Sequence, residues 1–154
     1  MVFLLAVLPG LLAATEVIER DGFRFEKTPI PDWVEPMELP TDWPTDAPGA
    51  DASGLRTWNV DWHSSLRAAD PVHYNELVVQ PLQSAKVADA ARHDLSFNPD
   101  YQTLRIHSVE VRRDGQWADR FRAERVTLAR REAEFESDME TGTVSALIVV
   151  DDVR

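Results

Sequence analysis

The chain has 154 residues, of which 28% are charged, and its formal net charge is -11. That balance repels phosphate backbones and anionic lipid headgroups, so nucleic acid is excluded as an expected partner. The chain contains no cysteine, which excludes disulfides, thiolate nucleophiles and cysteine-ligated zinc within these residues. Its length suits a single globular domain.

Residues 1–14, MVFLLAVLPGLLAA, carry no charged side chain and are typical of the apolar part of a secretory signal peptide. A helix of this length, at about 1.5 Å per residue, falls short of the ~30 Å hydrocarbon core of a membrane. We therefore expect export to the periplasm or cell envelope, with no membrane span apart from this segment. An uncleaved anchor or an N-terminal strand is the alternative, because no Lys or Arg precedes the apolar run.

Residues 15–27 contain two short runs joined by Asp21-Gly22, which predicts a two-residue hairpin because glycine tolerates positive φ. Residues 28–70 are predicted to form an extended arm. Proline recurs every few residues as far as Pro48, fixing φ and removing backbone donors, so we expect neither a helix nor a central strand there.

The arm is rich in tryptophan, and two interpretations of it remain open. Exposed indoles could stack on sugar rings or grip a Pro-rich peptide, which would make the arm an interaction surface. Alternatively, each indole pins the arm to the body of the domain, with a neighbouring Asp as a turn residue. The candidate interaction residues are Trp33, Trp43, Trp58 and Trp62.

Residues 71–154 are predicted to form a partial antiparallel β-sandwich, so the expected fold class is all-β. Strands are expected over 72–79 and 88–97, and a second hairpin at Asp114-Gly115. Alternating apolar residues change parity between Ile106 and Val109, which predicts a β-bulge near His107-Ser108.

Two later segments complete the predicted sandwich. Residues 125–137 fit either a strand or a helix, because their apolar residues match both periods. Residues 146–150, ALIVV, predict a strand that is buried on both faces and needs a neighbour on either side.

A search for reaction chemistry finds no catalytic residue, no metal ligand and no cofactor-binding motif. The four histidines are too scattered to form a short metal-binding pair: His63, His73, His93 and His107. A run of carboxylates spaced two apart is more typical of a solvated face than of a glycosidase pair: Glu132, Glu134, Glu136 and Asp138. No nucleophile elbow or Gly-rich phosphate loop is present.

The second half of the chain nevertheless resembles a known family. The residues that carry the resemblance are FNPDYQTLRIHSVEVRRDGQW (97–117) and ARREAEFESDMETGTVSALIVVDDVR (129–154). As an ordered set they are similar to the domain of unknown function 3857, which lies ahead of a transglutaminase-like domain in exported bacterial proteins.

The resemblance implies a non-catalytic accessory or interaction domain whose partner is a downstream transglutaminase-like domain of the same polypeptide. That domain would act through a Cys, His and Asp set, none of which lies in these residues. It also implies that the chain stops inside the sandwich, so that its last strand exposes an unpaired edge. The alternative is a stand-alone envelope module that binds glycan or Pro-rich peptide through the Trp-rich arm.

Overall fold

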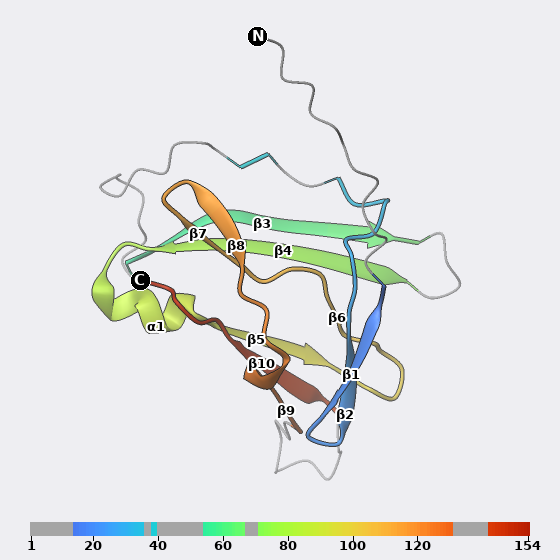
Figure 1. The fold of residues 1–154 in the computed structure, drawn as a ribbon. Helices are drawn as coiled ribbons and strands as arrows, with labels where there is room; N and C mark the ends of the chain where they lie inside the picture. Colours follow the sequence, from blue (N-terminus) through green and yellow to red (C-terminus); the bar gives the residue numbers. More distant parts are fainter. Residues whose placement is uncertain (1–13, 36–37, 40–53, 67–70, 131–141) are drawn as a thin grey trace, which may run out of the picture.

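The structure is a computed structural model that describes residues 14–35, 38–39, 54–66, 71–130 and 142–154. Regular structure in these residues is mainly β-strand, arranged in four small sheets, which confirms the all-β class (Figure 1). The strands are β1 (Glu16–Arg20), β2 (Phe23–Lys27), β3 (Leu55–Ser65), β4 (Val72–Pro81), β5 (Arg92–Phe97), β6 (Arg105–Ile106), β7 (Glu110–Arg113), β8 (Gln116–Asp119), β9 (Val126–Arg130) and β10 (Val144–Val149). The helical turns are η1 (Ser84–Lys86), α1 (Val87–Ala90) and η2 (Ala123–Arg125). None of the described helices is long and apolar enough to cross a membrane.

Both predicted hairpins are present. β1 pairs with β2 and β7 pairs with β8, each pair antiparallel and joined by an Asp-Gly turn. The two residues of each turn have positive φ, at 52° and 81° for Asp21-Gly22 and at 49° and 78° for Asp114-Gly115. This left-handed pair matches the twist of the flanking strands, and Asp and Gly are among the residues that tolerate it best.

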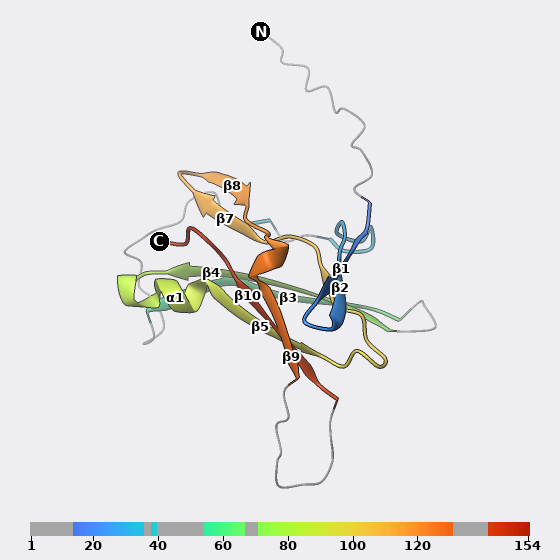
Figure 2. The same ribbon diagram turned by 60° about the horizontal axis from the view of Figure 1, so that its bottom comes forward.

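The strand near the end of the chain lies in the middle of its sheet. β10 pairs with β5 on one side and β9 on the other, so the predicted neighbours are confirmed (Figure 2). The expectation of an unpaired edge on this strand is wrong, because both of its edges are bonded. The expected burial on both faces is also wrong: Val144, Ala146 and Ile148 face the core, whereas Val149 is 38% exposed.

The main core lies between this sheet and the sheet formed by β1, β2 and β6. Phe25 of β2, Val126 of β9 and Val144 of β10 are fully buried. The remaining buried members of this cluster are Phe97, Ile106, Leu128, Ala146, Ile148 and Val150. Every one of these residues is apolar, so the core stabilises the fold through the ordinary hydrophobic term of about 25 cal/mol per Å² of apolar surface.

A side chain joins the two sheets where no backbone ladder does. The backbone N–H of Leu128 in β9 donates to Oδ2 of Asp21 at 3.0 Å. Leu128 is only 3% exposed, so few water molecules can reach its N–H. Without the Asp21 carboxylate this donor would be buried and unsatisfied, which lowers stability. The turn of the first hairpin is therefore bonded to the edge of β9, and we call this contact between Asp21 and Leu128 the clasp.

The long hairpin of β3 and β4 corrects the prediction for residues 28–70. Residues 55–65 form a regular strand within the predicted arm, and it pairs with β4 along almost its whole length. Proline ends at Pro48 and does not return until Pro71, so nothing prevents a strand between them. A β-bulge lies between Thr57 and Asn59.

The structure differs from three further predictions in detail. The strand predicted over 88–97 begins only at Arg92, because the alanine-rich residues before it form α1. No bulge forms near His107-Ser108; the parity changes because β6 pairs with β2 and β7 pairs with β8, in different sheets. Of residues 125–137, Arg125 ends η2, Val126–Arg130 is a strand, and residues 131–137 lie outside the described residues.

We predict that Asp21→Gly lowers the free energy of unfolding by about 1 to 2 kcal/mol more than Asp114→Gly does. Glycine accepts the positive φ at both positions, so the difference isolates the bond to Leu128. Urea denaturation of the two variants measures it. Equal losses would show that the clasp contributes nothing.

A second prediction concerns His93 in β5, which lies opposite Ile148 of β10. Burial holds the pKa of His93 below its ordinary value, although a backbone hydrogen bond near Ala90 partly opposes the shift. Below about pH 6.5 the unfolded chain takes up a proton that the folded chain refuses, so stability falls as the pH falls towards the lower folded pKa. Urea denaturation across this range should show the slope in the wild type and in His73→Gln, and lose it in His93→Gln. An unchanged slope in His93→Gln would assign the effect to another group.

Candidate functional site

The structure describes the indoles of two of the four predicted tryptophans. Trp33 is half-buried just after β2, and Trp43 lies outside the described residues. Trp58 and Trp62 belong to β3, where the backbone of Trp62 lies opposite Asn75. The side chain of Trp62 also lies outside the described part of the structure, so Trp33 and Trp58 are the two candidates whose indoles it describes.

Trp58 has partners on its own hairpin. It lies at the β-bulge, and its indole N–H donates to Oε1 of Gln80 at 2.9 Å. The guanidinium carbon of Arg56 lies 5.1 Å from the centre of the Trp58 ring, which is cation–π range. Arg56 is itself buried, with 8% exposure. These contacts hold the Trp58 indole against its own hairpin.

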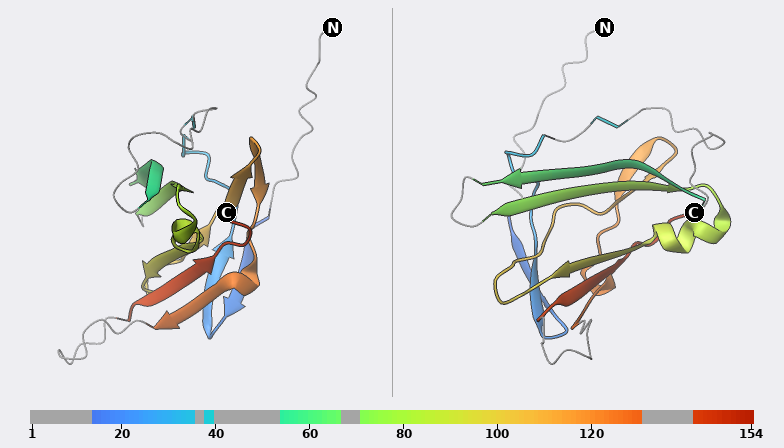
Figure 3. Two further views of the ribbon diagram at one scale, coloured as in Figure 1. Left: turned by 90° about the vertical axis from the view of Figure 1, so that its left-hand side faces the viewer. Right: turned by 180° about the vertical axis from the view of Figure 1, so that it is seen from behind.

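One face of the β3–β4 hairpin is exposed, contains an apolar pair and carries no Asp, Glu, Lys or Arg among the side chains that the structure describes. Val60 and Leu77 lie directly opposite each other and are 56% and 53% exposed. Further along, Ser64 and His73 also lie opposite each other and share a hydrogen bond of 2.9 Å. We call these four residues, together with exposed Asn75, the outer face. In Figure 3 the hairpin lies to one side of the remaining strands.

The opposite side of the hairpin carries a cluster of ionisable rings. Tyr74, which is 6% exposed, contacts the ring of His63 at 5.8 Å between ring centres and that of His107 at 5.5 Å. His63 Nε2 lies 2.7 Å from a carboxylate oxygen of Asp61. His107 Nδ1 lies 3.1 Å and 2.9 Å from the carbonyl oxygens of Thr28 and Pro29. We call Asp61, His63, Tyr74 and His107 the inner cluster.

The inner cluster joins distant parts of the chain, because the His107 ring contacts Tyr74 of β4. Burial raises the pKa of Tyr74, and the nearby carboxylates of Glu76 and Asp61 raise it further. The phenol is therefore a weak acid that is held neutral, which suits packing. Within the described residues no three His, Cys, Asp or Glu side chains are placed to hold a metal ion. The carboxylates at 132, 134, 136 and 138 lie outside those residues.

Three arginines gather on one carboxylate beyond β10. Asp152 accepts hydrogen bonds from Arg113 at 2.8 Å, Arg154 at 3.1 Å and Arg120 at 3.3 Å. The bonds from Arg113 and Arg154 are the main reason that the pKa of Asp152 lies below its ordinary value. Arg113 also donates to the backbone carbonyl oxygen of Asp152. The network ties the β7–β8 hairpin to the segment after β10.

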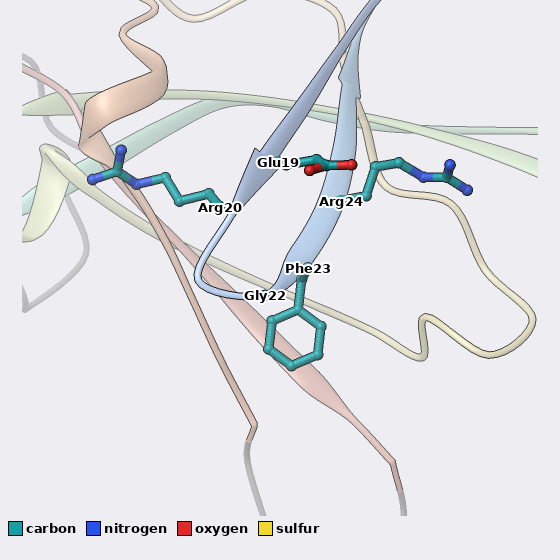
Figure 4. A pocket seen from close by; sticks show the side chains of 5 residues that line it. All are labelled: Glu19, Arg20, Gly22, Phe23 and Arg24. Atoms are coloured by element: carbon teal, nitrogen blue, oxygen red, sulfur yellow. The ribbon is translucent and has the colours of Figure 1, made fainter.

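A hollow of about 460 Å³ lies at the turn of the first hairpin and is lined by Glu19, Arg20, Gly22, Phe23 and Arg24. Figure 4 shows that its charged side chains diverge: Arg20 points to one side of the hairpin, and Glu19 and Arg24 point to the other. The guanidinium of Arg20 instead donates to the carbonyl oxygen of Glu124 at 3.1 Å. Side chains that do not converge cannot orient a ligand, so we do not assign a site here.

Sequence reasoning missed both faces of the hairpin. The outer face could have been found from the alternation within LRTWNVDWHSS once the proline-free segment was recognised as a strand. The inner cluster has no local signal, because His107 lies more than thirty residues after Tyr74 in the sequence.

Comparison with known proteins places the chain in one family. Residues 70–154, more than half of the chain, match the model of DUF3857, described as a Domain of Unknown Function with solved-structure structure. The chain belongs to this family, and the part that matches begins just before β4 and includes β5 to β10. No curated protein and no solved structure matches the chain.

The raised pKa of Tyr74 predicts a delayed step in an alkaline titration. Tyr74 should ionise above about pH 10, and because the folded state resists this ionisation, stability should fall as the pH rises beyond that value. Ultraviolet absorbance of tyrosinate measures the titration. The late step should vanish in Tyr74→Phe and remain in Tyr101→Phe, which removes the other tyrosine. A late step that persists in Tyr74→Phe would contradict the assignment.

Proposed function

We propose that this chain is a non-catalytic interaction domain and the N-terminal part of an exported transglutaminase-like protein. It acts in the periplasm or cell envelope, and its first partner is the transglutaminase-like domain of the same polypeptide. The observation that carries the proposal is the outer face of the β3–β4 hairpin, where Val60 and Leu77 form an exposed apolar pair.

The physical argument starts from the hairpin itself. A two-stranded sheet is marginally stable alone, and this one buries Tyr74 on its inner side while leaving Leu77 on its outer side in water. Covering apolar surface contributes about 25 cal/mol per Å². The outer face carries no Asp, Glu, Lys or Arg, although 28% of the chain is charged. A partner that covers it would therefore bury no unpaired carboxylate, ammonium or guanidinium group.

Two sequence features support the location and the parent protein. Residues 1–14 are typical of a secretory signal, which supports export. The order of motifs in residues 97–154 resembles the domain that precedes transglutaminase-like domains, and this supports the proposed partner. Trp58 supports the glycan or Pro-rich peptide alternative less well, since its N–H is bonded to Gln80 and Arg56 lies over its ring.

The proposal predicts that Leu77→Glu weakens binding of this chain to the transglutaminase-like domain encoded in the same reading frame by at least about tenfold. A buried and unpaired carboxylate is costly, and a loss of 1.4 kcal/mol already gives a factor of ten. Isothermal titration of the two separately produced domains measures the affinity. Circular dichroism of the variant shows whether the hairpin still folds.

The matched control is Leu95→Glu, which places the same charge on an exposed leucine of β5, in another sheet. It should leave the affinity unchanged. Equal effects of the two variants would remove the outer face from the interface. A reading frame without such a domain would remove the proposed partner, and peptidoglycan fragments or Pro-rich peptides titrated by tryptophan fluorescence would then test the Trp-rich arm.

A further inference from the structure

The chain contains the same tripeptide, Arg-Asp-Gly, at residues 20–22 and at 113–115. Each copy supplies the two-residue turn of an antiparallel hairpin. The φ angles of Asp21 and Asp114 differ by a few degrees, as do those of Gly22 and Gly115. Local sequence and backbone conformation are therefore matched, and any difference in behaviour must come from the surroundings.

The surroundings of the two carboxylates differ. The Asp21 carboxylate is held by the backbone N–H of Leu128 at 3.0 Å. Asp114 is exposed, and its carboxylate has no hydrogen bond or ion pair within the part of the chain that the structure describes. The two glycines do not differ in this way, because a Cβ placed at either Gly22 or Gly115 would meet no atom within 4 Å. The Asp114 side chain is thus free to change rotamer, whereas Asp21 must first release β9.

We propose that Asp114 is a site of spontaneous isoaspartate formation. Asp21 is protected from the same reaction by its own contact with β9. The backbone nitrogen of Gly115 attacks Cγ of Asp114, the N–Cγ bond forms, and the carboxyl hydroxyl leaves as water. The product is a cyclic succinimide. Glycine at the following position offers no side chain to hinder the approach.

Hydrolysis then completes the change. Water adds to the main-chain carbonyl carbon of the succinimide, and the bond between that carbon and the Gly115 nitrogen breaks. The chain now continues through the former side chain, and the main-chain carbonyl has become a free carboxylate. The water lost in the first step is regained in the second, so the composition is unchanged and no co-reactant is needed.

The position of Asp114 gives the modification a structural consequence. An isoaspartate adds one carbon to the backbone of the turn, so the strict pairing of Arg113 with Gln116 is disturbed. Arg113 also donates to Asp152 at 2.8 Å and anchors the hairpin to the segment after β10. The modification would therefore loosen the β7–β8 hairpin from the rest of the domain.

The test is a peptide map of the native chain after prolonged incubation in mildly acidic buffer. A protease that cleaves before aspartate but not before isoaspartate reports each site, and an isoaspartate-specific methyltransferase assay on the separated peptides confirms the product. We expect several-fold more isoaspartate at residue 114 than at residue 21. Equal amounts at the two sites in the native chain would overturn the proposal.

The matched control is the same incubation in concentrated urea. Unfolding removes the contact with Leu128 and leaves two identical tripeptides, so the two rates should approach each other. A preference for residue 114 that persists unchanged in urea would assign the difference to more distant sequence rather than to the fold, and would also overturn the proposal. Neither result depends on the proposed interaction with a partner domain.

Discussion

The fold depends on one core that two small sheets bury jointly without sharing a backbone ladder. Phe25 comes from one sheet, Val126 and Val144 come from the other, and all three are fully buried. Hydrogen bonds between neighbouring strands usually fix such an arrangement, but here the first hairpin is bonded through side chains: Asp21 accepts from Leu128, and Arg20 donates to the carbonyl oxygen of Glu124. Apolar burial therefore supplies most of the stability, and these side-chain hydrogen bonds help to set how the sheets meet.

The β3–β4 hairpin is attached in another way. The inner cluster links it to the rest of the domain, because the buried ring of Tyr74 lies between His63 of the hairpin and His107 beyond β6. Attachment through side chains on one face leaves the opposite face in water, and this is where Val60 and Leu77 are exposed. The interaction surface that we propose thus follows from how the hairpin is anchored.

The sequence predicts the features that depend on neighbouring residues. Both Asp-Gly hairpins and the central position of β10 follow from short patterns, and all of them are present. Features that depend on distant residues were missed or misplaced. Nothing local links His107 to Tyr74, and the parity change near His107 was assigned to a bulge because sequence spacing cannot show that a chain changes sheets. The candidate Trp58 was found, but its contacts with Gln80 and Arg56 could not be.

The two Arg-Asp-Gly turns show where the limit of local sequence lies. The tripeptide determines the backbone, because both copies adopt the same left-handed pair of residues. It does not determine what the carboxylate does, because one turn meets the edge of β9 and the other projects with β7 and β8 away from it. In the turn at residues 20–22 the carboxylate accepts a hydrogen bond from a buried N–H and joins two sheets. In the turn at residues 113–115 it is left to solvent beside a glycine nitrogen, so tertiary placement alone separates a structural clasp from a reactive group.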